Sequence, residues 1–174
     1  MKNIPILESQ LEALNQAMVE QNIFTTVILI GGFAGRFLLD GYRQTLDIDF
    51  LLRSIDDNSK YDIWRELLFS RGMEEVSVVE VPPVEDVEPF ATLTYSNLKV
   101  IVPTVEYFAV TKIFSDRKKD EEDLVQQGIL AACNPKKLQQ MLDEYKDYVL
   151  NQNSFNSNYV TLREVLKSYG ITTS

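Results

Sequence analysis

The order of patterns along this 174-residue chain predicts an α+β (α/β-like) fold, in which a mixed β-sheet flanked by helices is followed by a helical C-terminal part. Three observations support this prediction. Residues 25–30 form an apolar, β-branched run, residues 46–52 largely alternate between apolar and polar, and the residues after Pro103 place apolar side chains at helical spacing. We therefore expect a core at residues 1–103 and a helical part at 104–174, packed together as a single compact unit.

Helices and strands are expected to alternate in the core. Leu7, Leu11, Leu14 and Met18 recur at helical spacing, which predicts an amphipathic helix over residues 7–21. The other elements expected in the core are helices at 33–40 and 59–70, strands at 25–30, 46–52 and 76–81, and a hairpin of strands 90–95 and 98–102. The helical part is expected to contain helices at 104–115, 120–132, 135–150 and 160–169, with an Asn- and Ser-rich linker at 151–158.

The chain has no histidine and one cysteine, Cys133, which excludes several classes of active site. Zinc sites of the His/Cys kind, Ser-His-Asp triads and Cys-His dyads need residues that this sequence lacks. Chemistry must therefore come from carboxylates, Lys, Arg, Tyr, hydroxyl groups or a cation held by oxygen atoms. A lone cysteine forms no internal disulfide, and a reducing cytoplasm is the expected location.

The net charge of −9 argues against a surface that grips nucleic acid broadly, because neutralising phosphates requires clustered Lys and Arg. No apolar run approaches the roughly 20 residues of a membrane-spanning helix. The N-terminal residues also lack the pattern of a secretory signal. We therefore expect neither a membrane partner nor a broad nucleic-acid surface.

Asp47 and Asp49 stand two residues apart in the strand expected at 46–52. Residues at this spacing point to the same side of a strand, so two carboxylates can converge on one Mg²⁺ or Mn²⁺ ion. Without a cation the pair is unfavourable, since aspartate is depleted in strands and like charges on one face repel. Taken alone, an Asp-x-Asp pair is more typical of an edge strand with a polar outer face.

Gly31 and Gly32 follow the buried strand 25–30 and precede a helix. Glycines at such a junction let the backbone approach a ligand closely and present N–H groups at a helix N-terminus, which is an anion site suited to a triphosphate. A plain tight turn would use the same residues. The combination is more specific than either half, because a phosphate cradle is followed some fifteen residues later by two carboxylates that can bind a cation.

Residues 27–34 (VILIGGFA) and 41–50 (GYRQTLDIDF) resemble the nucleotidyltransferase superfamily of the DNA polymerase β type. Within it they are most similar to small bacterial proteins related to the abortive-infection nucleotidyltransferase toxins. The shared pattern is an apolar strand, Gly-Gly or Gly-Ser, a short helix, Arg-x-Thr, and Asp-x-Asp in a strand. A second, softer match is Lys112 followed by Arg117-Lys118-Lys119-Asp120 and Asp123. Beyond these segments the chain matches only in the order of its elements.

The resemblance implies a nucleotidyltransferase fold and a site for a metal-bound nucleoside triphosphate. Asp47 and Asp49 would be the catalytic, metal-binding carboxylates, while Gly31 and Gly32 would cradle the phosphates. The implied reaction is the attack of an acceptor hydroxyl group, on RNA, a protein or a small molecule, on the α-phosphate of the nucleotide. A toxin–antitoxin role rests on the family resemblance alone.

Other residues bear on the same site, each with a structural alternative. Members of the superfamily usually add a third carboxylate; the hairpin strands offer none, and Glu80 is the acidic residue nearest on an expected strand. Phe33 occupies the position after the glycines where many relatives place a small hydroxyl residue. Arg43 and Thr45 are expected to fix the turn before the strand, and they are close enough to bind the nucleotide as well.

Two features of the helical part are also ambiguous. Lys112 lies on an apolar helix face, where its stem can run along the core and its ammonium group reach solvent, or where the ammonium group can bind a phosphate. Asp120 is expected to be a helix N-cap followed by an acidic first turn.

Three functions remain open at this point. The chain is a metal-dependent nucleotidyltransferase, a non-catalytic descendant that binds a nucleotide or a protein partner in the same cleft, or a structural module without a ligand. The first requires three oxygen ligands that converge on one cation, whereas the second needs only the aspartate pair and the glycine turn. The third predicts that Asp47 and Asp49 face bulk solvent, far from Gly31.

Overall fold

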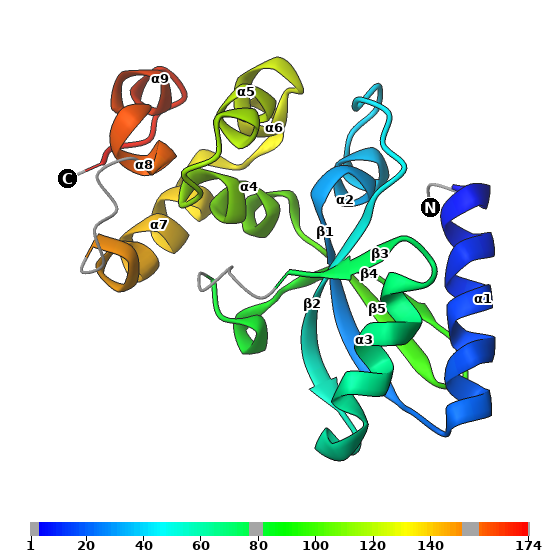
Figure 1. The fold of residues 1–174 in the computed structure, drawn as a ribbon. Helices are drawn as coiled ribbons and strands as arrows, with labels where there is room; N and C mark the ends of the chain where they lie inside the picture. The colour runs from blue at the N-terminus through cyan, green and yellow to red at the C-terminus, as the bar shows by residue number, and fades with distance from the viewer. Residues whose placement is uncertain (1–3, 77–81, 151–156, 174) are drawn as a thin grey trace. The chain divides into compact units, whose positions relative to one another are not determined.

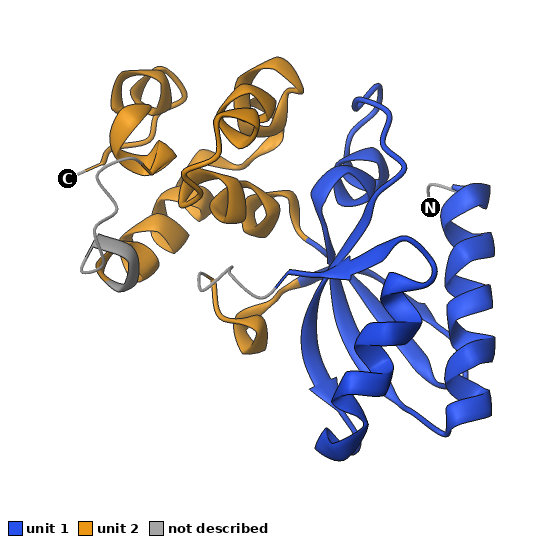
Figure 2. Cartoon of the chain, in the orientation of Figure 1, with its two compact units in different colours: residues 1–77, 89–103 blue, residues 78–88, 104–174 orange. Residues whose placement is uncertain are grey.

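The computed structural model describes residues 4–76, 82–150 and 157–173, without the side chains of residues 148–150. The chain divides into two compact units (Figure 2). The first consists of residues 1–77 and 89–103, and the second of residues 78–88 and 104–174. The boundary between Pro103 and Thr104 therefore separates a sheet-containing unit from a helical one, and the helical unit also includes the segment that precedes the hairpin.

The first unit contains a five-stranded mixed sheet with the strand order β3-β2-β1-β5-β4 (Figure 1). The central strand β1 (Thr25–Ile30) pairs antiparallel with β2 (Ile48–Ile55) and parallel with β5 (Leu98–Pro103). On the outside, β3 (Met73–Glu75) runs parallel to β2, and β4 (Pro89–Thr94) runs antiparallel to β5. The mixed sheet with flanking helices and a helical C-terminal region, as the sequence predicts, is confirmed.

Three α-helices accompany this sheet: α1 (Pro5–Gln21), α2 (Gly31–Leu38) and α3 (Tyr61–Phe69), the last preceded by the 3-10 turn η1 (Asn58–Lys60). Helix α1 starts with a proline in its first turn and ends at Asn22, whose left-handed backbone (φ 53°) stops the helix. Its apolar stripe, Leu7, Leu11, Leu14 and Met18, is buried as expected. In Figure 1, α1 and α3 lie beside each other, and α2 follows directly from the end of β1.

Strand β2 begins two residues later than the alternation of residues 46–52 predicts. Leu46 is 80% exposed and does not join Ile48 and Phe50 in the core. The reason lies in the register: Asp49 pairs with Ile30, the last residue of β1, and the chain then enters α2 at Gly31. Residues before Ile48 therefore have no β1 backbone to pair with, so apolar alternation alone misplaced the start of the strand.

The strand expected at 76–81 lies outside the described residues except for Val76. The strand that pairs with β2 in this region is the short β3, which aligns Met73 with Ile48 and Glu75 with Phe50. The Val76 N–H donates to the Phe50 carbonyl at 2.8 Å.

The second unit is helical, with α4 (Val105–Ile113), α5 (Lys118–Gln126), α6 (Ile129–Ala132), α7 (Pro135–Leu150), α8 (Asn158–Thr161), α9 (Arg163–Ser168) and the 3-10 turn η2 (Val84–Asp86). Thr104 caps α4, because its hydroxyl oxygen accepts the Tyr107 N–H at 3.3 Å. The single helix expected at 120–132 is two helices, since Gly128 adopts a left-handed backbone (φ 77°) between α5 and α6.

Cys133 belongs to the core of this unit. It is 8% exposed, and burial, with a smaller contribution from Glu106, raises the pKa of its thiol to about 12. The Cys133 thiol donates a hydrogen bond to the Ile129 carbonyl, and the sulfur and oxygen atoms are 3.3 Å apart. Because the reactive form is the thiolate, Cys133 is a chemically inert packing residue at neutral pH.

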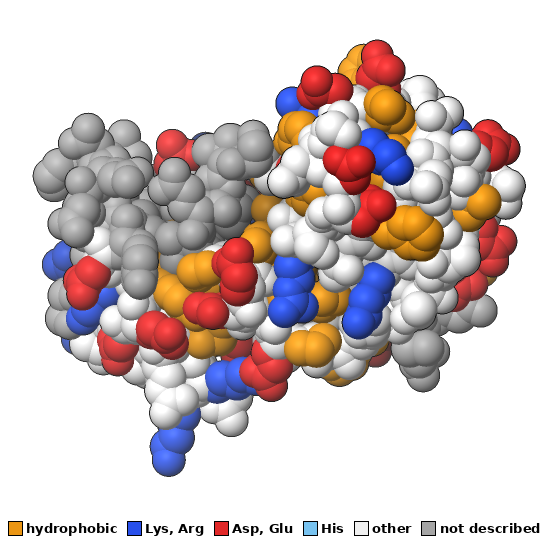
Figure 3. Space-filling model, turned by 90° about the horizontal axis from the view of Figure 1, so that it is seen from below, with side chains coloured by type: hydrophobic (Ala, Val, Ile, Leu, Met, Phe, Trp, Pro, Cys, Tyr) orange, Lys and Arg blue, Asp and Glu red, His pale blue; other side chains and the backbone are white. Residues whose placement is uncertain are grey.

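No helix among the described residues is long and apolar enough to cross a membrane. On the face of the molecule shown in Figure 3, acidic and basic side chains are interspersed with apolar ones.

Candidate functional site

The junction between β1 and α2 brings a carboxylate against a glycine. Gly31 has a left-handed backbone (φ 69°), and a Cβ atom at this position would lie 2.6 Å from Asp49 Oδ2. The β1–β2 register causes this contact, because Ile30 is the direct partner of Asp49 and Gly31 is the next residue. Gly31 is thus required both for its backbone angle and for the space that the Asp49 carboxylate occupies. The Asp49 carboxylate therefore lies beside the glycine turn at Gly31.

The loop after α2 folds back over the first turns of that helix. A Cβ atom at Gly32 would lie 2.4 Å from Thr45 Cγ2, and one at Gly35 would lie 2.4 Å from the ring of Tyr42. Gly31, Gly32 and Gly35 therefore seat three side chains that come from the loop and the start of β2. The contribution of Gly35 and Tyr42 was not predicted, although a third glycine inside a short helix is a signal of close packing.

Thr45 links the glycine turn to Asp47. Its side chain covers Gly32, and its hydroxyl oxygen accepts the Asp47 N–H at 3.2 Å. Asp47 itself is exposed and lies just before β2, whereas Asp49 is half-buried within the strand. The two carboxylates therefore sit in different environments: one is held against the turn and the other is open to solvent. Arg43 lies beside them in sequence, and its guanidinium carbon is 5.8 Å from the Tyr42 ring centroid.

The described residues contain no group of three or more Asp, Glu, Cys or His side chains that could hold a metal ion. Glu80, the residue named as a third carboxylate, lies outside the described residues. Phe33, which follows the glycines, is 1% exposed and has the Arg36 guanidinium 5.1 Å from its ring centroid. Phe33 is thus a core residue of α2.

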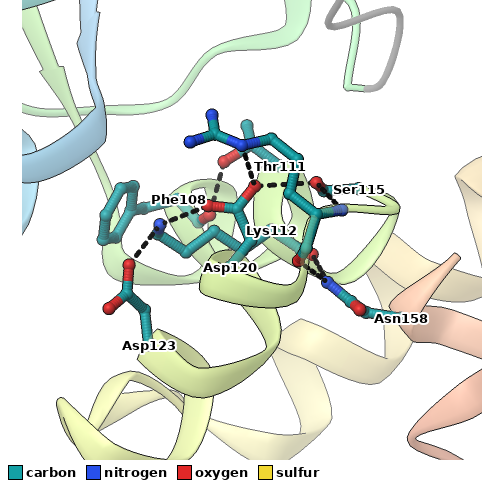
Figure 4. A network of polar contacts seen from close by, with 8 residues as sticks. Phe108, Thr111, Lys112, Ser115, Asp120, Asp123 and Asn158 are labelled. Atoms are coloured by element: carbon teal, nitrogen blue, oxygen red, sulfur yellow. Dashed lines mark hydrogen bonds and ion pairs between the residues drawn. The ribbon is translucent and has the colours of Figure 1, made fainter.

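Lys112 is the centre of a buried charge network in the helical unit (Figure 4). Its ammonium nitrogen is 3.0 Å from Asp120 Oδ1 and 3.0 Å from Asp123 Oδ2, and its side chain is only 6% exposed. The ammonium group also lies 5.2 Å from the Phe108 ring centroid. The alternative in which this lysine reaches bulk solvent is therefore wrong, because two carboxylates hold the ammonium group inside.

Asp120 is not the N-cap of α5, in contrast to the prediction. The helix starts one turn earlier, with Arg117 as its N-cap residue and without a side-chain cap. Asp120 is 9% exposed, and its second carboxylate oxygen accepts the Ser115 hydroxyl at 2.7 Å. Its role as a charge partner of Lys112 was missed, because helix-start signals and buried ion pairs use the same residue types.

Asn158, the last residue of the expected linker, is the first residue of α8 and extends this network. Its side-chain amide donates to the Lys112 carbonyl at 2.8 Å, and its backbone N–H donates to the Ser115 carbonyl at 2.8 Å. Asn158 is 2% exposed. Residues from α5 thus hold the Lys112 ammonium group, and Asn158 of α8 holds the backbone at the end of α4 (Figure 4).

A family model described as a nucleotidyltransferase of unknown function (DUF6036) matches residues 6–169 of the chain. The match covers both units, and the chain belongs to this family. Neither the comparison with curated proteins nor the comparison with solved structures finds a significant match. The family therefore agrees with the resemblance seen in residues 27–50, and a relation to the toxins stays a prediction.

Replacing Lys112 by Met should lower the free energy of unfolding by about 3–5 kcal/mol, because two buried carboxylates would lose their counter-charge. Urea denaturation of the variant measures this loss. Lys119→Met, an exposed change on α5, is the control and should stay within about 0.5 kcal/mol of the original chain. A loss at Lys112 no larger than at the control would contradict the ion network.

Proposed function

We infer that this chain transfers a nucleoside monophosphate from a nucleoside triphosphate to an acceptor hydroxyl group, with Asp47 and Asp49 as ligands of a divalent cation. The observation that carries the proposal is the contact of the Asp49 carboxylate with Gly31, at the N-terminus of α2. It supports the proposal because one of the two predicted carboxylates lies beside the predicted phosphate cradle. Membership of a nucleotidyltransferase family supports the same chemistry.

The residues present fit a magnesium or manganese ion. Mg²⁺ is commonly bound by one or two carboxylates, with water and substrate phosphate oxygens as the remaining ligands. Asp49 supplies a carboxylate that is fixed against the glycine turn, and Asp47 supplies one that is open to solvent two residues earlier. Two carboxylates are therefore enough for such an ion, although the described residues contain no group of three or more ligand side chains, provided that the nucleotide contributes oxygen atoms.

Electrostatics explains why a nucleotide would need the cation here. The first N–H groups of α2 point away from the helix and attract anions. The Asp49 carboxylate beside Gly31 would repel a triphosphate that approached these groups alone. A divalent cation held by Asp47 and Asp49 would offset this repulsion. Nucleotide binding should therefore depend on the metal.

In the proposed reaction, the acceptor oxygen forms a bond to the α-phosphorus atom while the bond from this phosphorus to the bridging oxygen of the β-phosphate breaks. Pyrophosphate leaves, and the proton of the acceptor hydroxyl is released. The bound cation would offset negative charge on the phosphates. Asp47 and Asp49 would fix its position, Gly31 and Gly32 would orient the phosphates, and Arg43 and Thr45 would hold the loop that carries Asp47.

A second function, binding of a nucleotide or a protein partner without transfer, is favoured by one observation. The described residues contain no group of three or more acidic, cysteine or histidine side chains that could hold a metal ion. General-base activation of an acceptor would then lack an obvious protein group, while binding of the metal–nucleotide pair needs none. Transfer and binding are separated by the experiments below.

Mg²⁺ or Mn²⁺ together with a nucleoside triphosphate should stabilise the folded chain by mass action and raise its melting temperature. At a hundredfold excess of ligand over Kd, the free energy of unfolding should rise by about 2.7 kcal/mol. The double variant Asp47→Asn/Asp49→Asn should lose this shift. Asp62→Asn/Glu66→Gln removes two exposed acidic groups from α3 and should keep the shift. An unchanged shift in the Asp47/Asp49 variant would place the nucleotide elsewhere.

Gly31→Ala should weaken metal–nucleotide binding because the new Cβ displaces the Asp49 carboxylate. Gly72→Ala is a matched control: Gly72 has the same φ of 69°, but nothing lies within 4 Å of its Cβ position. Both variants should lose about 1–2 kcal/mol of stability from the left-handed backbone. Only Gly31→Ala should reduce the ligand-induced thermal shift, and an equal reduction in the two variants would contradict the role of this contact.

A triphosphate labelled at the α-phosphate should mark an acceptor in cell extract in the presence of Mg²⁺ or Mn²⁺, while a γ-labelled one should not. The label should disappear with Asp47→Asn/Asp49→Asn. Transfer of the γ-label would indicate phosphoryl transfer instead. If no base and neither metal gives labelling while the thermal shift persists, the binding function replaces the transferase function.

A further inference from the structure

The two edges of the sheet differ in how they are protected. At one edge, β3 is only three residues long and carries Glu74 and Glu75. At the other edge, β4 is six residues long, and the stretch from Pro89 to Leu98 contains no charged residue. Short strands and charges prevent an edge from pairing with another chain, whereas a longer neutral edge invites such pairing. Only the first residues of β4, with Pro89 and a register shift before Ala91, interrupt it.

The backbone of β4 offers bonding groups on its open side. The Tyr95 N–H donates to the Leu98 carbonyl at 2.8 Å, which makes these two residues a hydrogen-bonded pair of the β4–β5 hairpin. In an antiparallel ladder such pairs alternate with non-bonded ones. Thr94 opposite Lys99 and Thr92 opposite Ile101 are therefore the non-bonded positions, and their N–H and C=O groups point away from β5.

The side chains at these positions are exposed as well. Thr92 and Thr94 are exposed, and Phe90 is 61% exposed although its ring meets that of Phe37 edge-on, with centroids 6.4 Å apart. A phenylalanine this exposed on a neutral strand is an apolar surface without a cover among the described residues. Its alternation with two threonines gives the edge one exposed row of β-branched and aromatic side chains.

We propose that β4 pairs with β4 of a second copy of this chain, antiparallel and about a two-fold axis at Thr92. The argument is self-complementarity. In this register Thr92 faces Thr92 of the partner subunit, and Phe90 faces Thr94 of the partner subunit. Thr92 and Thr94 contribute the backbone groups that β5 leaves unbonded, whereas Phe90 lies within the register shift between Pro89 and Ala91 and contributes its side chain. Threonine–threonine and aromatic–β-branched pairs are favourable across strands, and the absence of charge removes like-charge repulsion at a symmetric contact.

The pairing joins the two five-stranded sheets into one continuous sheet across the dimer. A different partner, such as an extended segment of another protein, would use the same backbone groups but would not need the symmetry at Thr92. Pairing with a second copy therefore has a specific consequence. Any side chain introduced at residue 92 lies opposite the same side chain of the partner subunit across the two-fold axis.

Sedimentation equilibrium of the full chain tests this proposal. Between low concentration and about 1 mM, where even a weak interface is populated, the mass should rise from 20.0 kDa toward twice that value. Thr92→Lys should keep the protein at the monomer mass, because two ammonium groups would meet at the axis. Thr92→Val, which stays neutral and β-branched, should dimerise. Gln16→Lys adds the same charge at an exposed position of α1 and should also dimerise.

Mixing charges separates the contact from an effect on folding. Thr92→Glu alone should be monomeric, while an equimolar mixture of Thr92→Lys and Thr92→Glu should regain the doubled mass. A chain that stays at 20.0 kDa up to the highest concentration overturns the proposal. So does a Thr92→Lys variant that dimerises as well as the original chain, or a mixture that remains monomeric. None of these outcomes depends on nucleotide transfer.

Discussion

The register between β1 and β2 is the constraint on which the candidate site depends. It places Asp49 opposite Ile30, so the carboxylate reaches the first residue after the strand, and only glycine leaves it room. A one-residue slip would move Asp49 to the other face of the sheet and would bury its charge among the apolar side chains. Ile48 and Phe50, both fully buried neighbours of Asp49, oppose such a slip. Burial of Ile48 and Phe50 therefore holds the Asp49 carboxylate beside the glycine turn.

The carboxylates of interest differ in solvent exposure between the two units. In the sheet-containing unit, Asp47 remains exposed and Asp49 half-buried, so these carboxylates keep contact with solvent. In the helical unit, Asp120 and Asp123 are buried with Lys112, and Ser115 completes the bonding of Asp120. A buried pair of this kind costs desolvation energy, which good geometry offsets only in part. Its clearest consequence is a defined arrangement of α4 and α5, because the alternatives leave a buried charge without a partner.

The sequence predicted much of the fold because its signals are local. The apolar run of β1, the stripe of α1 and the start of α7 at Pro135 all depend on neighbouring residues only. Where pairing decides the outcome, local patterns failed: Leu46 has the right alternation for a strand but no partner strand beside it. The break at Gly128 was missed because one glycine inside a helical pattern does not reveal whether its backbone is left-handed.

The same distinction applies to the candidate site. Gly31, Gly32, Asp47 and Asp49 could be singled out by their spacing, but the contact of Asp49 with Gly31 depends on the β1–β2 register, which only the structure gives. Gly35 and Tyr42 could not be paired in advance, because their contact depends on the path of a loop. Lys112 was ambiguous for a similar reason, since its partners come from another helix.

The contact between Gly35 and Tyr42 makes these two positions interdependent in any drift of the sequence. A side chain at residue 35 can be accommodated only after the ring at residue 42 has become smaller, and that first step opens a void that the chain can survive. Substitution of residue 42 before residue 35 is therefore tolerated, whereas substitution of residue 35 first is not. The order in which these two positions can change is set by their contact and cannot be inferred from either residue alone.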